Sequence, residues 1–257
     1  MPDGLQNIFW KKSWKTYLIE RLVQVGEGLF VDVGANVGQT LLDLHLIKPE
    51  VHYLGFEPNI TCVNYLNDLI RINSLIHYQI APVGLAEKSN CRPLMRHKDE
   101  LTDSCGSIIS DLRPGRAFDM DMIPCFRFDD IRQDLALGKI GFIKIDVEGA
   151  ELEALTGMET SIQECRPIVL CEVLFTDSKA DLEIMKKRNS TLMQFLNRMN
   201  YVVYQIIKSK DAAHVVDTKE MLTFSSAYWT MDNKELCDYL FVPEERVEMT
   251  LSSLIAR

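Results

Sequence analysis

Short apolar runs alternate with segments of helical periodicity along most of this chain, and this alternation constrains its fold more than any other feature. The apolar runs predicted to be strands are residues 29–33, 52–56, 77–80, 140–145, 168–173, 201–207 and 239–242. The segments predicted to be helices are residues 7–25, 39–47, 61–72, 150–164 and 180–199. Two strands joined through a helix pair in parallel, and the connecting helices cover the faces of the sheet. The sequence therefore predicts an α/β fold with a mostly parallel sheet and helices on both faces.

The segment 87–120 departs from this pattern. It contains many turn-forming and charged residues with little periodicity, so we expect a long loop with at most short helices. We find no internal repeat, no low-complexity tract and no linker that would divide the chain. We therefore expect one domain over residues 1–257, with a helical cap (1–28), a core (29–175) and a C-terminal helix and hairpin with an insertion (176–257).

The composition disfavours several classes of protein. The 257 residues include 28 basic and 37 acidic side chains, and the net charge of −9 disfavours a surface that follows nucleic-acid phosphates. No stretch approaches the roughly 20 apolar residues of a membrane-spanning helix, and the N-terminus lacks the apolar core of a secretion signal. The seven cysteines include no C-x-x-C pair, which argues against a disulfide framework or a cysteine zinc site. We therefore expect a cytoplasmic protein without a membrane span or a nucleic-acid partner; the oligomeric state stays open.

Glycines follow the first predicted strand, at the edge of a parallel sheet where ligands bind. The run there is Asp32-Val33-Gly34-Ala35-Asn36-Val37-Gly38. Gly34 and Gly38 allow the backbone to turn tightly and to approach a ligand. In the dinucleotide fingerprint G-x-G-x-x-G, the second and third glycines would stand at Asn36 and Gln39. Because both are missing, a pyrophosphate is poorly provided for. The turn favours a nucleotide-like ligand without phosphates, and S-adenosylmethionine is the obvious candidate.

Two acidic residues suit that ligand. Asp32 lies at the end of the first strand, where its carboxylate would meet the positive charge of the ligand's ammonium or sulfonium group. Glu57 ends the second strand, 25 residues later, and an acid there accepts hydrogen bonds from both hydroxyls of an unphosphorylated ribose. Alone, each acid has a plainer explanation as a solvated side chain. A nicotinamide-dependent oxidoreductase and a non-catalytic module that binds S-adenosylmethionine are the alternative functions.

Three carboxylates and a lysine gather around the end of the strand at residues 140–145. Side chains alternate along a strand, so Lys144 and Asp146 point the same way, about 6–7 Å apart. Glu148 follows in the turn before a helix, and Glu172 lies at the end of the next strand. Such acids repel one another unless a cation such as Lys144, a shared proton or a metal ion stabilises them. Oxygen ligands would favour Mg²⁺ or Ca²⁺ over zinc, but we assign no metal. A purely structural salt-bridge network is the alternative explanation.

Several runs resemble the FkbM-type family of S-adenosylmethionine-dependent methyltransferases. They are Phe30–Gly38, Gly55–Pro58, Val83-Gly84-Leu85, Ser107–Ile109, Arg127–Ile131, Phe142–Gly157, Ile168–Val173 and Tyr239–Pro243. The resemblance is strong over residues 29–175, and the sequence KIDVEGAE is its most specific part. It implies a Rossmann-like class I methyltransferase whose seven-stranded, mostly parallel sheet ends in an antiparallel hairpin of residues 201–207 and 239–242. The N-terminal helix and residues 208–238 have no usable match, so we expect substrate specificity to lie there.

These arguments together give the expected site. The expected cofactor-binding residues are Asp32, Gly34, Ala35, Asn36, Gly38, Glu57, Pro58, Val83, Ser107 and Asp146. The expected catalytic residues are Lys144, Asp146, Glu148 and Glu172. Methyl transfer from a sulfonium is an in-line displacement that depends on orientation, and a hydroxyl acceptor also needs a base. We expect Asp146 or Glu148 to be that base, tuned by Glu172 and Lys144, in an enzyme that O-methylates a sugar or another small metabolite. N-methylation and other acceptors stay open.

Overall fold

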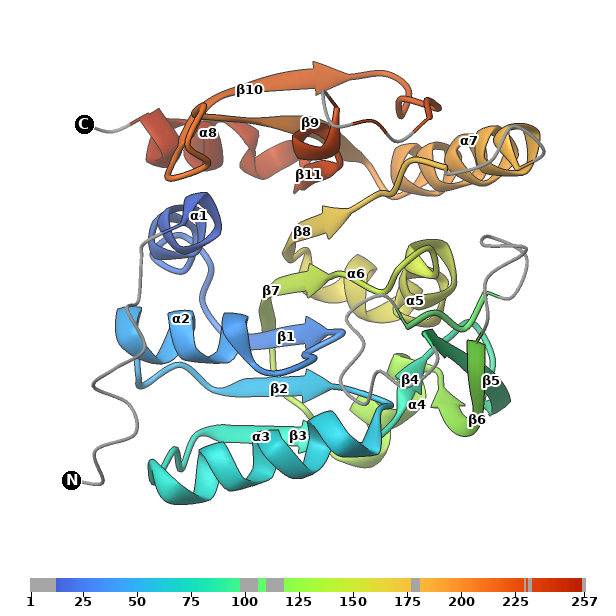
Figure 1. The fold of residues 1–257 in the computed structure, drawn as a ribbon. Coiled ribbons are helices and arrows are strands. Elements are labelled where there is room, and N and C mark those ends of the chain that lie inside the picture. The colour runs from blue at the N-terminus through green and yellow to red at the C-terminus, as the bar shows by residue number, and fades with distance from the viewer. Residues whose placement is uncertain are drawn as a thin grey trace.

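A large mixed sheet forms the centre of the fold (Figure 1). The structure is a computed structural model that describes residues 13–97, 106–109, 118–176, 181–228, 230 and 233–255. Within these residues the sheet has eight strands in the order β10-β9-β11-β8-β7-β1-β2-β3. Their bounds are β1 Leu29–Val33, β2 Tyr53–Phe56, β3 Tyr78–Ala81, β7 Ile140–Ile145, β8 Ile168–Glu172, β9 Tyr201–Lys208, β10 Val215–Met221 and β11 Asp238–Pro243. β3, β2, β1, β7 and β8 are parallel, and β11 is antiparallel to β8 and β9. The predicted mostly parallel α/β sheet with an antiparallel C-terminal pair is confirmed.

The sheet has one strand more than the seven predicted. The additional strand is β10, which pairs with β9 at the edge of the sheet and lies within residues 208–238. Its sequence, VVDTKEM, is largely polar, and none of its side chains is fully buried. Edge strands commonly carry charged side chains, because only one of their sides pairs with a neighbour. Backbone hydrogen bonds to β9 therefore stabilise this strand, although its sequence has no apolar run that would predict it.

Helices cover both faces of the sheet (Figure 1). They are α1 Trp14–Leu22, α2 Gln39–Ile47, α3 Ile60–Ile72, α4 Phe128–Asp134, α5 Glu151–Gly157, α6 Glu159–Cys165, α7 Leu182–Arg198 and α8 Val247–Ile255, with short 3₁₀ turns at Lys234–Leu236 and Glu244–Arg246. Buried side chains of α1, α2, α3 and α8 belong to one hydrophobic core, and those of α4, α5, α6 and α7 belong to a second core. The predicted two layers of helices are therefore confirmed.

The helix predicted at residues 150–164 is broken into α5 and α6 at Met158. Asp129 gives a physical reason for the break. Its carboxylate accepts hydrogen bonds from the backbone N–H groups of Thr160 and Ser161, both at 2.9 Å. These bonds cap the start of α6, where N–H groups would otherwise lack partners. The contact joins segments about 30 residues apart, so periodicity within the helix does not reveal it.

The N-terminal helix starts at Trp14 in the structure. Ser13 caps it, because the Ser13 hydroxyl accepts a hydrogen bond from the Thr16 backbone N–H at 3.3 Å. Residues 7–12, which belong to the predicted helix, lie outside the described ranges. No helix in the described ranges combines the length and the apolar character needed to cross a membrane.

A second sheet occupies part of the loop predicted at residues 87–120, and residues 98–105 and 110–117 of that loop lie outside the described ranges. Its strands are β4 Gly84–Leu85, β5 Asn90–His97 and β6 Phe118–Phe126, in the order β4-β6-β5. One face of this sheet buries Leu94 and Ile123 in a small core of their own. The apolar alternation that marks a strand is interrupted in both sequences, by Pro93 and arginines in β5 and by Pro124 and aspartates in β6. The prediction of a loop is therefore wrong for β5 and for the first three residues of β6, and these two strands are held together by their pairing rather than by a strong local pattern.

Candidate active site

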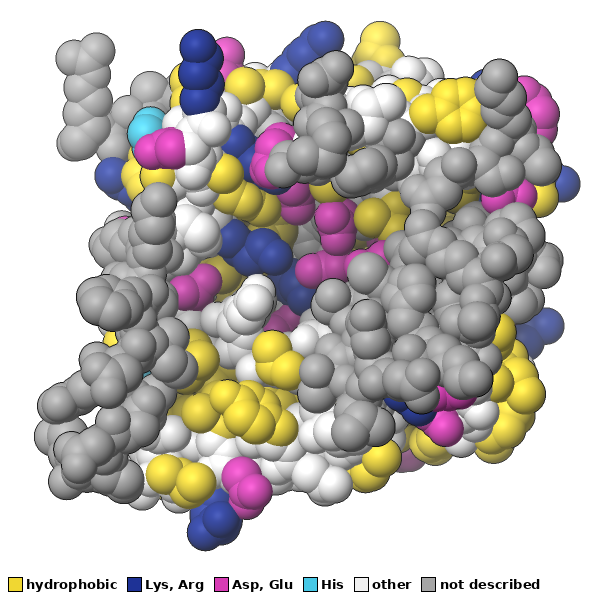
Figure 2. Space-filling view, in the orientation of Figure 1, with side chains coloured by type: hydrophobic (Ala, Val, Ile, Leu, Met, Phe, Trp, Pro, Cys, Tyr) yellow, Lys and Arg dark blue, Asp and Glu magenta, His cyan; other side chains and the backbone are white. Residues whose placement is uncertain are grey.

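A cavity of about 290 Å³ lies at the carboxyl ends of β1, β2, β7 and β8. Figure 2 shows basic and acidic side chains gathered in a hollow near the centre of the corresponding face. The predicted site residues that line the cavity are Gly34, Ala35, Asn36, Glu57, Pro58, Val83, Lys144, Asp146, Glu148 and Glu172. Three other predicted residues, Asp32, Gly38 and Ser107, do not line it. The strand-end argument therefore brings most of the predicted residues to one place.

The turn between β1 and α2 forms one wall of this cavity. Gly34 has a φ angle of +83°, and a Cβ atom there would lie 2.0 Å from the Asp146 carbonyl oxygen. Asn36 also has a positive φ angle, of +46°, and its side-chain oxygen accepts a hydrogen bond from the Val37 N–H at 2.7 Å. Gly38 caps α2 with a φ angle of +83°, where a Cβ atom would lie 2.6 Å from the Leu66 side chain. Gly38 thus packs the turn against α3 and does not line the cavity.

Glu57 follows β2 and is 6% exposed. One of its carboxylate oxygens accepts the Asn36 N–H at 2.8 Å, and the other accepts the Asn59 N–H at 2.8 Å. Burial raises the pKa of Glu57, although these two hydrogen bonds and Lys144 oppose the shift. A carboxylate offers about four lone-pair positions, so two remain for a ligand. The backbone of two loops therefore orients Glu57 at the cavity wall.

Asp32 does not face the cavity, contrary to the prediction that it meets the charge of a ligand. It is fully buried. One of its oxygens accepts the Tyr53 hydroxyl at 2.7 Å, and the other lies 3.2 Å from the Lys144 ammonium. Asp32 and Lys144 are direct neighbours in the parallel register of β1 and β7, so their side chains lie on the same face of the sheet. Lys144 also donates to the Gly34 carbonyl at 2.8 Å. The Asp32 charge is thus compensated inside the protein.

The predicted carboxylate cluster is present at the other end of the cavity. One oxygen each of Asp146, Glu148 and Glu172 lies within 4.8 Å of the others. Burial opposes ionisation of Asp146, but Lys144 at 3.5 Å and Lys15 at 3.8 Å outweigh it and hold the pKa of Asp146 well below its usual range. Burial and the Asp146 charge raise the pKa of Glu172. Two lysines therefore compensate the charge of Asp146 in this cluster, and we assign no metal ion to it.

Ser107 and the turn at Glu148 hold each other in place. The Ser107 hydroxyl donates to the Glu148 carbonyl oxygen at 2.7 Å. Glu148 has a φ angle of +57°, which is uncommon for a residue other than glycine, so the surrounding structure determines this conformation. The next backbone N–H, of Gly149, donates to the buried Glu151 carboxylate at 2.8 Å. Ser107 therefore supports the site from outside, while its neighbours Gly106 and Ile108 line the cavity.

Several residues that line the cavity were not predicted. Lys15 reaches it from α1, beside the carboxylates. Arg96 and Leu94 reach it from β5, where Arg96 pairs with Asp121 at 2.6 Å. Asn59 lines it just after Glu57, and its backbone N–H bond to Glu57 follows from the E-P-N turn. Only Asn59 had a local signal, because the other three lie on elements whose position depends on the tertiary fold.

Comparison with known proteins adds independent findings. The family model of the methyltransferase FkbM domain matches residues 32–203. Methyltransferase sdnD from Sordaria araneosa is 28% identical over 155 residues, a match that covers 50% of this chain and 60% of that protein. The crystal structure of methyltransferase FkbM from Methylobacillus flagellatus KT aligns with a TM-score of 0.51 and 18% identity, over 84% of this chain and 43% of that chain. This chain thus spans about half of the length of these relatives, and the structural likeness concerns the fold alone.

Proposed function

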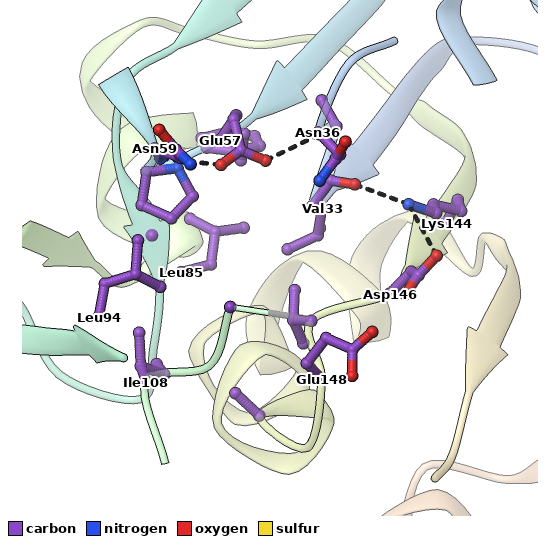
Figure 3. A pocket seen from close by; sticks show the side chains of 18 of the residues that line it. Val33, Asn36, Glu57, Asn59, Leu85, Leu94, Ile108, Lys144, Asp146 and Glu148 are labelled. Atoms are coloured by element: carbon purple, nitrogen blue, oxygen red, sulfur yellow. Dashed lines mark hydrogen bonds and ion pairs between the residues drawn. The ribbon is translucent and has the colours of Figure 1, made fainter. Parts of the chain in front are cut away.

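Because this chain belongs to the FkbM methyltransferase family, we propose that it transfers a methyl group from S-adenosylmethionine to a hydroxyl of a sugar or another small metabolite. The observation that carries this proposal is one cavity with two chemically different ends. Glu57 lies at one end, and Asp146 and Glu148 lie at the other (Figure 3). The first end can accept hydrogen bonds from a ribose diol. The second end can stabilise the positive charge of the cofactor and remove the proton of an acceptor hydroxyl.

The residues at the first end fit the adenosyl part of the cofactor. Glu57 keeps lone pairs available for the two ribose hydroxyls after it has accepted its two backbone hydrogen bonds. Apolar side chains beside it offer a slot for the purine, and they are Pro58, Val83, Leu85, Leu94 and Ile108. The ionised Asp146 offers a negative charge towards the positively charged methionine part. When bound, S-adenosylmethionine supplies a methyl group that its sulfonium makes electrophilic.

The second end supports a neutral hydroxyl acceptor and a carboxylate base. Three acids close together disfavour an anionic acceptor, which they would repel. Asp146 is the weakest base of the three, since Lys144 and Lys15 hold its pKa low. Burial and the Asp146 charge raise the pKa of Glu172, so Glu172 is not available as an ionised base at neutral pH. Glu148 is therefore our choice for the base that takes the proton of the acceptor hydroxyl.

Binding of the cofactor can be tested without knowing the acceptor. Isothermal titration of the whole chain with S-adenosylhomocysteine should give a binding isotherm, and NAD⁺ should give none. Glu57→Gln should weaken binding by about tenfold to a hundredfold, because an amide NH₂ cannot accept a hydrogen bond. Glu50→Gln, at an exposed acid just before β2, is the matched control and should bind as wild type does. Equal affinity of the Glu57→Gln variant would remove Glu57 from the cofactor site.

Transfer can be tested with methyl-labelled S-adenosylmethionine and a metabolite extract, followed by mass spectrometry of the labelled product. We expect a neutral product that carries the label on oxygen. Glu148→Gln should lower turnover by about a hundredfold or more while the affinity for S-adenosylhomocysteine stays unchanged. Unchanged turnover would exclude Glu148 as the base. A protein that binds the cofactor but labels nothing would instead support the non-catalytic alternative.

A further inference from the structure

Glu172, at the end of β8, is surrounded by other polar groups that do not carry positive charge. One oxygen of its carboxyl group lies within 4.8 Å of an oxygen of the Asp146 carboxyl group, so the two carboxyl groups are direct neighbours. One of its oxygens accepts a hydrogen bond from the Cys237 thiol at 3.1 Å. Asp238 completes the group, because one polar atom each of Glu172, Cys237 and Asp238 lies within 4.8 Å of the others.

Basic side chains lie beside the neighbours of Glu172. The ion pairs are Lys144 with Asp146 at 3.5 Å, Lys15 with Asp146 at 3.8 Å and Lys208 with Asp238 at 2.5 Å. Among the residues with described positions, no lysine or arginine forms an ion pair with Glu172 itself. The cations of this region thus stabilise the ionised forms of Asp146 and Asp238, and leave Glu172 between two negative charges.

Two neighbouring carboxyl groups repel each other unless one of them holds a proton, and this arrangement of charges decides which group holds it. The ionised form is favoured where the lysines are, at Asp146, and disfavoured where only anions are near, at Glu172. We propose that Glu172 works as a neutral carboxylic acid whose hydroxyl donates to Asp146 and thereby holds the Asp146 carboxylate in position at the cavity. Burial, with the charges of Asp146 and Asp238, raises the pKa of Glu172 and is consistent with this assignment.

Glu172 is on this account a positioning residue. One of its oxygens accepts from the Cys237 thiol, and the proposed hydroxyl on the other carboxyl oxygen donates to Asp146. The role rests on the proposed methyl transfer, since Asp146 lies beside Glu148, the proposed base. Ionisation of Glu172 would remove the donor to Asp146 and add a negative charge next to it. The Asp146 carboxylate would then lose its fixed direction, and the wild-type activity should decline on the alkaline side.

Other titratable groups lie on the elements packed around Glu172, either beside it or, for the three lysines, beside its neighbours Asp146 and Asp238. They are Asp146 and Glu148 after β7, Cys237 and Asp238 at β11, Lys144 on β7, Lys15 on α1 and Lys208 on β9. Neighbouring carboxylates raise the pKa of Lys144 and of Lys208, which keeps both protonated, and Asp146 stays ionised because its pKa is held low. Burial raises the pKa of the Cys237 thiol, which keeps it a donor. Burial and the Asp146 charge raise the pKa of Glu172 to about 9, so Glu172 is expected to lose its proton above neutral pH.

The protonation of Glu172 can be measured without any methyl transfer. Infrared difference spectra of the whole chain, wild type minus Glu172→Gln, should show the C=O stretch of a protonated carboxyl group at neutral pH. The band should disappear as the pH is raised. Burial also raises the pKa of Glu151 and of Asp238, so these acids can contribute bands of their own. The band is assigned to Glu172 because the Glu172→Gln variant lacks it. Absence of the band from this difference spectrum at neutral pH would overturn the proposal, whatever the protein methylates.

Activity supplies the second measurement. Glutamine has the shape of a neutral glutamic acid, and its NH₂ group can donate to Asp146 while its carbonyl accepts from Cys237. Glu172→Gln should therefore keep neutral-pH activity within about threefold, and should lack the alkaline decline of kcat/KM. Glu172→Ala should lose about tenfold to a hundredfold, since it leaves Asp146 without its donor. A Glu172→Gln variant as impaired as Glu172→Ala would refute the role of a neutral donor, and circular dichroism of both variants would verify their folding.

Discussion

Lys144→Met removes the cation that lies between β1 and β7, and we expect it to lower the free energy of unfolding by about 3–5 kcal/mol. Lys144 is 5% exposed, donates to the Gly34 carbonyl at 2.8 Å and lies 3.2 Å from Asp32. Without it, the fully buried Asp32 would keep only the hydrogen bond from Tyr53, at 2.7 Å. The cost comes mainly from this uncompensated buried charge, because methionine fills most of the volume of the lysine side chain.

Urea unfolding followed by circular dichroism at neutral pH measures this effect. Lys139→Met is the matched control, since Lys139 is an exposed lysine directly before β7, and should change the stability by less than about 0.5 kcal/mol. The double variant Asp32→Asn with Lys144→Met should recover about half of the loss or more, because it removes the unpaired charge. A loss below about 1 kcal/mol in Lys144→Met, or a double variant no more stable than the single one, would refute the reasoning.

Two further predictions concern backbone geometry and pH. Gly34→Ala should cost about 2–3 kcal/mol and abolish S-adenosylhomocysteine binding, since its φ is +83° and a Cβ would lie 2.0 Å from the Asp146 carbonyl oxygen; Gly138→Ala, where a Cβ would meet nothing within 4 Å, should be neutral in the same assays. Burial raises the pKa of Glu151 from 4.5 to about 7, so the folded protein keeps this proton up to a higher pH than the unfolded chain does. The free energy of unfolding therefore falls as the pH rises from about 4.5 to about 7. Glu151→Gln should remove that fall, worth about 3 kcal/mol at most, in unfolding measured from acid to neutral pH; an unchanged pH dependence would contradict the burial argument.

Local patterns were sufficient for most of the main sheet. The strands predicted at residues 29–33 and 140–145 and the helix predicted at 39–47 match β1, β7 and α2 residue for residue. Each combines a strong local period with a clear boundary, a glycine-rich turn or a charged residue. The same procedure failed for β5, β6 and β10, whose sequences are polar or contain proline. Those strands form because a partner strand supplies hydrogen bonds, and a partner distant in the chain leaves no periodic signal.

The candidate site was predicted unevenly for a related reason. The family resemblance is confirmed by the match to residues 32–203, and most predicted residues line one cavity. Asp32 does not line the cavity, because a strand-end acid can point towards the cavity or into the sheet, and the register with β7 decides between them. Lys15 was missed, because nothing in a helix at the N-terminus tells which strand end it covers. Cofactor binding by Glu57 and catalysis by the carboxylates remain proposals.

The sequence by itself determined the alternation of strands and helices, the tight turn after β1, and the kinds of polar residue that stand at the strand ends. These features depend on side-chain periodicity and on backbone freedom, which act over a few neighbouring residues. Only the tertiary structure decided that Lys144 neutralises Asp32, and that Asp146 and Glu172 share one proton between two lysines and a thiol. Charge pairing and protonation depend on distances of a few ångströms between residues far apart in the chain, and folding sets those distances.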